Sequence, residues 1–141
     1  MDCKTNLIEA KYHLSIAKRI IASYQEYPEK RFIIGTINES SIAAIKTIKC
    51  FLMLEKVSGG LSTFTKKVAP KYLEKEKIEH INKILKIKEA QSNSPIEFKK
   101  NEKIILLIDN EYRILTIDRL KEFVNSLDMA IKKIDTICRQ I

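Results

Sequence analysis

Hydrophobic and polar residues recur along most of the chain with the period of an amphipathic helix, most clearly between Ile33 and Glu55. Apolar or small residues there follow the spacing 3-4-3-4-3, namely Ile34, Ile37, Ser41, Ala44, Ile48 and Phe51. This spacing keeps side chains on one face of a helix with 3.6 residues per turn. The centre, Ser40–Ala44, is mostly small, so a neighbouring backbone can approach closely. We therefore predict a long helix and expect it to be the most buried in the protein.

Local signals set the limits of this helix and leave two alternatives for its start. Gly35 weakens a first turn that begins at Ile33. The segment Thr36-Ile37-Asn38-Glu39 has the form of a capping box, so the helix can instead begin at Thr36. Ser58-Gly59-Gly60 is expected to end the helix, because glycine readily adopts the left-handed conformation of a helix C-cap.

A second amphipathic pattern precedes this helix and extends from about Thr5 to Tyr24. Its apolar positions repeat the same spacing, at Leu7, Ala10, Leu14, Ala17, Ile21 and Tyr24. The Thr5 hydroxyl is a candidate N-cap, since it can accept a hydrogen bond from a first-turn amide. Tyr27-Pro28 ends the helix, because the residue before proline is disfavoured in the α region. The short link that follows favours an antiparallel helix pair.

The middle of the chain predicts two further helices and one helical turn. Leu61–Val68 is a short helical segment that Ala69-Pro70 interrupts, and proline can open a new helix in its first turn. Lys71–Gln91 is a longer and more exposed helix, because lysine and glutamate occupy most positions outside its apolar stripe. Ser94-Pro95-Ile96-Glu97 has the form of a capping box with proline at the first helical position, which predicts a single helical turn.

The periodicity then changes to that of β-structure. Lys103–Ile108 is a compact run of β-branched and aliphatic residues, and Tyr112–Ile117 is prone to strand formation. The intervening Asp109-Asn110-Glu111 favours a turn, so the sequence predicts a β-hairpin. An isolated hairpin is at best marginally stable in water, so we expect this one to pack on the helices or to pair with another chain.

The last helix is predicted from about Asp118 to Arg139, with Thr116 or Asp118 as its cap. Its apolar spacing is 4-3-4-3-4-3, at Leu120, Val124, Leu127, Ile131, Ile134, Cys138 and Ile141. Taken together, the elements predict a mainly all-α fold. The architecture is a four- to five-helix up-and-down bundle with a small β-hairpin, at about 103–117, before the last helix. At 141 residues the chain is expected to form a single domain, 1–141.

The chain carries a formal net charge of +8, from 26 basic and 18 acidic residues. Such a surplus favours nucleic acid, acidic partners or anionic surfaces. Lysine supplies most of the positive charge, although arginine is better suited to bidentate hydrogen bonds with phosphates and bases. Lys4, Lys11 and Lys18 lie seven residues apart and share one helix face, which is either a solvated face or a row directed at a ligand. No membrane span or signal peptide is recognised, so we expect a cytoplasmic protein.

The three cysteines, Cys3, Cys50 and Cys138, are odd in number and far apart in the sequence. No C-x-x-C pair occurs, and only two histidines are present, so we expect no structural zinc site. Cys50 and Cys138 adjoin apolar stripes and are expected to be buried thiols, because cysteine is among the most buried residue types. Cys3 is expected to be a terminal thiol.

Catalytic motifs are absent from the sequence. It contains no G-x-S-x-G, no G-x-G-x-x-G and no G-x-x-x-x-G-K-[ST], and we expect no cofactor. His13 is expected to be a half-buried helix residue. His80 follows Glu76 by four residues and is interpreted as a surface histidine in an ion-paired face, or alternatively as a general base. The pairs Glu9–His13 and Glu76–His80 could each bring two metal ligands to one helix face, but without further ligands we expect no metal.

The predicted layout resembles the HEPN (higher eukaryotes and prokaryotes nucleotide-binding) superfamily. The resemblance rests on the two long antiparallel helices, the second with the small-residue centre Glu39-Ser40-Ser41-Ile42-Ala43-Ala44-Ile45-Lys46, and on the helical pair that follows. Catalytic members of that superfamily carry an arginine four to six residues before a histidine and cleave RNA at a dimer interface. Lys75 occupies the arginine's place before His80, and lysine lacks the planar guanidinium that binds phosphate in a fixed geometry.

The resemblance therefore implies a helical homodimer without an intact ribonuclease site. Our first hypothesis is a non-catalytic interaction module that binds RNA or a partner protein, with no membrane and no metal. The alternative is a toxin-like ribonuclease of the HEPN type, with a degenerate site at His80 and Lys75. A third hypothesis is a regulatory, antitoxin-like protein that works only in complex with its partner.

Overall fold

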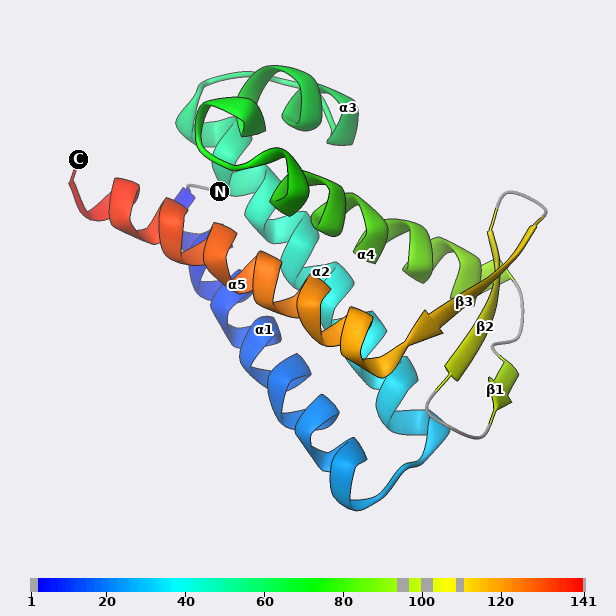
Figure 1. Ribbon diagram of the computed structural model, residues 1–141. Helices are drawn as coiled ribbons and strands as arrows, with labels where there is room; N and C mark the ends of the chain where they lie inside the picture. Colours follow the sequence, from blue (N-terminus) through cyan, green and yellow to red (C-terminus); the bar gives the residue numbers. More distant parts are fainter. Residues whose placement is uncertain (1–2, 94–96, 100–102, 109–110, 141) are drawn as a thin grey trace.

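The computed structural model describes residues 3–93, 97–99, 103–108 and 111–140, and it confirms the helical bundle with a small antiparallel β-structure before the last helix (Figure 1). Helix α1 (Cys3–Glu26) ends just before Tyr27-Pro28, as predicted, and runs antiparallel to α2. It begins at Cys3, so Thr5 lies inside the first turn and the prediction that it is the N-cap is wrong. The apolar stripe of α1 is buried as its spacing predicts.

Helix α2 (Lys30–Leu54) contributes more buried residues than any other helix, which confirms its predicted place at the centre of the core. It begins before both of the predicted starts. Thr36 does not cap it, because its Oγ1 donates a hydrogen bond to the Phe32 carbonyl oxygen one turn back, at 2.8 Å. Packing against the other helices therefore extends α2 through Gly35, where local propensity alone favours a later start.

The end of α2 also differs from the prediction. Lys56, rather than a glycine, adopts the left-handed conformation, with φ of 55°. Its amide donates to the Met53 carbonyl at 3.1 Å, and the Val57 amide donates to the Leu52 carbonyl at 3.0 Å. These two bonds form a Schellman motif, which satisfies carbonyl groups that a helix end otherwise leaves unpaired. The helix thus ends at Leu54, before the two glycines.

A compact helical turn connects α2 to α4. It consists of α3 (Leu61–Thr63), a π-helical turn (Phe64–Val68) and a 3-10 turn (Ala69–Lys71). The short helical segment is thus confirmed, but the following helix does not open at the proline. Helix α4 (Lys75–Asn93) begins four residues after the predicted Lys71.

The β-structure contains one strand more than the predicted hairpin. Strands β2 (Lys103–Ile108) and β3 (Glu111–Thr116) pair antiparallel, with Ile105 opposite Ile114. Strand β1 (Glu97–Lys99) pairs with β2 on its other side, which gives the order β1-β2-β3. Glu97 thus belongs to a strand, so the predicted helical turn does not extend to it, and the other residues of that turn, 94–96, lie outside the described residues.

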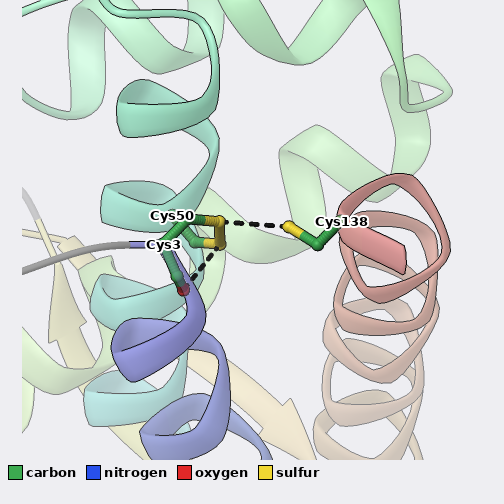
Figure 2. A group of neighbouring side chains, drawn as sticks. All are labelled: Cys3, Cys50 and Cys138. Atoms are coloured by element: carbon green, nitrogen blue, oxygen red, sulfur yellow. Dashed lines mark hydrogen bonds between the residues drawn. A yellow bond between two sulfur atoms is a disulfide. The ribbon is translucent and has the colours of Figure 1, made fainter. Parts of the chain in front are cut away.

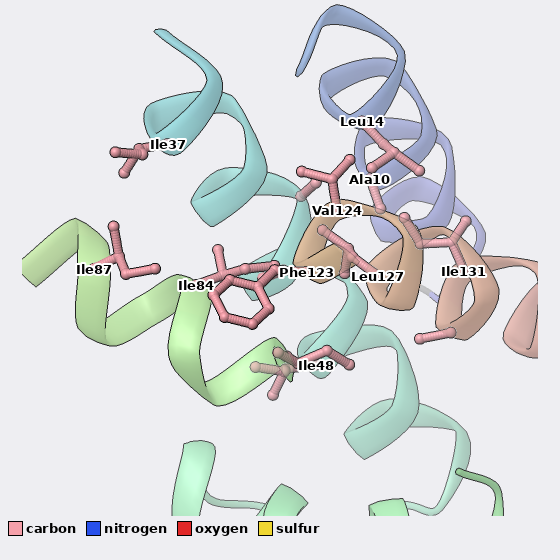
Figure 3. Packing of buried hydrophobic residues seen from close by; sticks show 14 of the residues in the cluster. Ala10, Leu14, Ile37, Ile48, Ile84, Ile87, Phe123, Val124, Leu127 and Ile131 are labelled. Carbon is pink, nitrogen blue, oxygen red and sulfur yellow. The ribbon is translucent and has the colours of Figure 1, made fainter. Parts of the chain in front are cut away.

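Helix α5 (Ile117–Arg139) closes the bundle against α1, α2 and α4. Thr116 is its N-cap, since the Thr116 side chain accepts a hydrogen bond from the Arg119 amide at 3.1 Å. Buried side chains from all four long helices and from the sheet form one hydrophobic cluster, part of which is drawn in Figure 3. None of the helices in the described part of the chain has the length and hydrophobicity needed to cross a membrane.

The direction of the helices decides which segments meet at each end of the bundle. Helices α1, α2, α4 and α5 alternate in direction, so the first turn of α1 lies near the last turns of α2 and α5 (Figure 1). The sheet lies beside the second half of α4 and the start of α5, toward the opposite end. Each of these two regions contains side chains that could bind a ligand or react.

Candidate functional site

A cleft of about 350 Å³ lies between α4, the β2–β3 hairpin and the first turns of α5. Four basic side chains from three different elements line it, namely Lys83, Lys86, Arg113 and Arg119. Its remaining lining is apolar, from Ile87, Leu106, Ile108, Ile114, Leu115 and Phe123. No acidic residue of the described segments lines this hollow, which we call the basic cleft.

The arrangement of the basic cleft follows from the local structure of its walls. Lys83 and Lys86 are three residues apart on α4, so they project from neighbouring positions of one helix face. Arg119 occupies the first turn of α5, which the Thr116 cap fixes at the end of β3. Its guanidinium lies 5.0 Å from the centroid of the Phe123 ring, a distance typical of a cation–π contact.

The charges of the basic cleft are only partly balanced. Arg113 Nη2 lies 2.7 Å from Glu111 Oε2, and Arg119 Nη1 lies 2.6 Å from a carboxylate oxygen of Glu122. Both pairs are more than half exposed, and exposed pairs are weak because water screens them. Lys83 and Lys86 have no ion-pair partner within the described ranges. A second hollow, of about 470 Å³, also has both lysines in its lining, together with the acidic Glu79.

His80 does not lie where its sequence context suggested. The expected surface histidine is buried, with 6% of its surface exposed. Its Nδ1 lies 2.6 Å from Ser126 Oγ of α5, and its ring centroid lies 4.9 Å from that of Phe123. Glu76 approaches only to 3.8 Å of Nε2. His80 therefore links α4 to α5 inside the bundle, whereas Lys75 is exposed at the first residue of α4.

The other histidine is half-buried, as expected, but it pairs with a different carboxylate. His13 Nδ1 lies 2.5 Å from Glu39 Oε2 of α2. Glu9 instead binds Lys46, with 2.6 Å between Oε2 and Nζ, and this bond lowers the pKa of Glu9. Glu9 and His13, which the sequence places on one helix face, thus each pair with a residue of α2.

The lysine strip of α1 is largely occupied within the molecule. Lys11 Nζ lies 2.9 Å from Asp135 Oδ1, and Lys18 Nζ lies 3.0 Å from Asp128 Oδ1. The two aspartates are seven residues apart on α5, as the two lysines are on α1, so the pairs repeat along the contact between these helices. Lys11 and Lys18 are therefore paired within the molecule rather than free to bind a ligand.

The three cysteines come together at the opposite end of the bundle (Figure 2). Cys3 of α1 and Cys50 of α2 form a disulfide, which corrects the expected pair of a terminal and a buried thiol. Cys138 of α5 is half-buried, and its Sγ lies 3.2 Å from the Cys3 Sγ. All three sulfurs lie within 4.8 Å of one another. We call this group the cysteine cluster.

The free thiol of the cysteine cluster has a perturbed acidity. Burial raises the pKa of Cys138, and the nearby Asp135 carboxylate raises it further. Lys4 and Lys11 act in the opposite direction, but more weakly. The Cys138 thiol therefore stays protonated to a higher pH than an ordinary cysteine.

Sequence reasoning identified neither the basic cleft nor the cysteine cluster. The paired lysines on α4 were visible in the sequence, but nothing there connects them to Arg113 and Arg119 across the sheet and α5. The cysteines are separated by 47 and 135 residues in the two contacts that they make, so local spacing carries no signal for them.

Comparison with known proteins gives no family for this chain. No protein-family model, no curated protein and no solved structure matches it. Its function must therefore be argued from its own residues.

Proposed function

We propose that this protein is a non-catalytic helical binding module that binds single-stranded RNA in the basic cleft and acts as a homodimer. The observation that carries the proposal is the convergence of four cations from α4, β3 and α5 on one hollow without acidic residues among its described lining. Such an arrangement suits a polymer of phosphates, because each neutralised phosphate releases bound counterions.

The apolar lining of the cleft favours single-stranded nucleic acid over a rigid duplex. Unpaired bases can be turned outward and stacked on aromatic or guanidinium planes, while lysines follow the backbone. The Arg119 guanidinium, which is about half exposed and lies over the buried Phe123 ring, supplies such a plane beside Lys83 and Lys86. A volume of about 350 Å³ is within the usual range for a small-ligand pocket, so one nucleotide can enter while its neighbours contact the adjoining lysines.

The location of His80 supports binding without cleavage. A general base must come within hydrogen-bond distance of the proton it removes. His80 is buried and already pairs with Ser126, and Lys75 is a point charge without the fork of an arginine. These features are consistent with a degenerate HEPN-like protein that shares the helical layout of the ribonucleases but not their activity. The ribonuclease alternative has less support.

The sheet supports the homodimer. Strand β3 pairs with β2 on one side, and within the described residues its other edge has no strand partner. Tyr112 and Ile114 on this strand are 76% and 65% exposed, which is unusual for large apolar side chains on an edge strand. Pairing with β3 of a second copy would satisfy the backbone groups of the edge and place Tyr112 against side chains of the partner strand.

The RNA proposal is tested by measuring affinity for a labelled single-stranded RNA over a range of salt concentrations. Replacing Lys83 and Lys86 together by alanine should weaken binding and make it less dependent on salt. Because each phosphate contact on a single strand contributes about 0.7 to the slope of log K against log salt, the loss of two contacts should reduce the slope by about 1.4. The double variant Lys66→Ala/Lys67→Ala is the matched control, since these exposed lysines lie outside the cleft and should leave the slope unchanged.

The same reactions, analysed for RNA fragments, test the non-catalytic part of the proposal. Wild-type protein and His80→Ala should leave the RNA intact, with similar affinity once folding of the variant is verified. Cleavage by wild type that disappears in His80→Ala would establish the ribonuclease instead, because general base catalysis contributes about 10²–10⁴-fold. Equal slopes for the two lysine double variants would place RNA binding outside the basic cleft.

A further inference from the structure

The cysteine cluster joins three helix segments that are distant in the sequence. Cys3 lies in the first turn of α1, Cys50 near the end of α2 and Cys138 in the last turn of α5, and their side chains point toward one another (Figure 2). The three sulfurs all lie within 4.8 Å of one another, so they form a compact group. Cys3 and Cys50 are joined in a disulfide, and the Cys138 sulfur lies 3.2 Å from the Cys3 sulfur.

The spacing of the sulfurs is close to that of a metal–thiolate site. Zinc–sulfur bonds are about 2.3 Å long, so two thiolates in a tetrahedral site lie about 3.8 Å apart. The contact between Cys3 and Cys138 is 3.2 Å, and the largest separation in the group does not exceed 4.8 Å. When the Cys3–Cys50 bond is reduced, its two sulfurs must separate by about 1.7 Å from bonding distance, whereas their distances to the Cys138 sulfur need to change by no more than about 1 Å.

The surroundings of the cluster can accept both the ion and its charge. A cleft of about 340 Å³ reaches Cys138 from the surface and provides an entry path. Lys4, Lys11 and Arg139 line this cleft together with Asp135. Three thiolates and one divalent ion carry a net charge of −1, and Lys4, Lys11 and Arg139 partly offset the opposing charge of Asp135.

We propose that the reduced protein binds one Zn²⁺ ion through the thiolates of Cys3, Cys50 and Cys138. The ion displaces the thiol protons, and water completes a four-coordinate site from the cleft. The Cys3–Cys50 disulfide and the zinc site exclude each other, because a sulfur in a disulfide is not a thiolate. A dithiol reductant supplies the two electrons and two protons that convert the disulfide to two thiols and is itself oxidised to a disulfide.

The test uses the chain 1–141 without a histidine tag, reduced with dithiothreitol and freed of reductant under nitrogen. Co²⁺ is added first, because thiolate-bound cobalt shows charge-transfer bands and tetrahedral d–d bands that other ligands do not give together. We expect one Co²⁺ per chain with both sets of bands, and loss of the bands as Zn²⁺ displaces cobalt. The oxidised wild type, in which Cys3 and Cys50 are joined, is the matched control. It should show neither the charge-transfer bands nor the tetrahedral d–d bands.

A ligand variant and a matched control locate the site. Since the loss of an outer-sphere partner alone weakens metal binding about 10–100-fold, Cys138→Ser should weaken Zn²⁺ binding by more than about 100-fold in competition with a chromophoric chelator. Thr136→Ser, a small change in the same turn of α5, should bind as the wild type does. The proposal is overturned if reduced and oxidised wild type bind equally, if the thiolate bands are missing, or if Cys138→Ser retains wild-type affinity.

Discussion

Small and hydroxylated residues make the centre of α2 suitable for burial. Ala43 and Ala44 are fully buried, and the buried Thr47 donates its hydroxyl proton to the Ala43 carbonyl at 2.7 Å. Ser41 does the same to the Asn38 carbonyl at 2.8 Å. Because these hydroxyls are satisfied within their own helix, they need no partner from the packed neighbours. The helix can therefore pass through the core with polar residues on its buried face.

Ala44 should be among the positions most sensitive to enlargement. Replacing it by leucine adds three carbon atoms at a fully buried site, and such overpacking typically destabilises a protein by about 1–3 kcal/mol. Urea denaturation of Ala44→Leu should show a free energy of unfolding lower by this amount. Lys49→Leu, at an exposed position of the same helix, should change it little. Equal stability of Ala44→Leu and wild type would show that the site has room for the larger side chain.

At the scale of elements, charged residues align α1 with α5. The pairs Lys11–Asp135 and Lys18–Asp128 repeat every seven residues along the contact. Burial raises the pKa of Asp128, but hydrogen bonds from Lys132 and Lys18 outweigh this effect and leave the pKa below its ordinary value of 3.8. The hydrogen bond from Lys11 lowers the pKa of Asp135 in the same direction, against a smaller opposing effect of burial.

These depressed pKa values predict a specific dependence of stability on pH. Both carboxylates bind protons more weakly in the folded than in the unfolded chain. Their contribution to the free energy of unfolding is therefore present above about pH 4 and is lost as the pH falls below it. The double variant Lys11→Ala/Lys18→Ala should be less stable than wild type at pH 7, by less than about 1 kcal/mol per pair because the lysines are substantially exposed.

Urea denaturation of both proteins between pH 7 and pH 2 measures this difference. The gap between wild type and the double variant should narrow as the pH falls below about 4. Lys66→Ala/Lys67→Ala controls for the loss of two positive charges elsewhere on the surface. If the difference in free energy of unfolding stays constant from pH 7 to pH 2, the lysines stabilise the fold by packing of their aliphatic stems rather than by charge.

At the scale of the whole molecule, the bundle separates two kinds of chemistry. The basic cleft lies beside the sheet and the start of α5, whereas the cysteine cluster lies near the end of α5. Helix α5 contributes to both, with Arg119 at one end and Cys138 at the other. Because the two regions share no residue, the proposed RNA binding and the proposed zinc binding can be tested independently.

The exposed edge of β3 predicts how two copies associate. A lysine on an edge strand opposes pairing with a second strand, because its charge would have to be brought to the interface. Tyr112→Lys should therefore shift the protein from dimer to monomer in light scattering at high micromolar concentration. Tyr27→Lys makes the same replacement at a residue that is 63% exposed between α1 and α2, and it should remain dimeric. A monomeric wild type would contradict the homodimer, and a dimeric Tyr112→Lys would place the interface elsewhere.

Local sequence patterns predict most of the elements and the faces that they bury. The apolar spacing identified buried residues of α1, α2 and α5, because a regular helix fixes which side chains share a face. Ile34 and Cys138 of the predicted stripes are only half-buried, and Ile141 lies outside the described residues. The hairpin was equally local, since β-branched runs on either side of a turn determine both strands. Errors occurred mainly at the ends of elements, such as the start of α2, where packing extends a helix beyond its local signals.

Which distant residues meet depends on how the helices and the sheet pack against one another. His80 had a polar sequence context, yet it became buried because Ser126 and Phe123 of α5 face it across the helix contact. Cys3 and Cys138 lie 135 positions apart, and their contact depends on the antiparallel arrangement of α1 and α5. The basic cleft likewise requires the sheet to lie beside α4. The periodicity of a sequence determines which face of an element is buried, but the neighbour of that face depends on how all elements pack together.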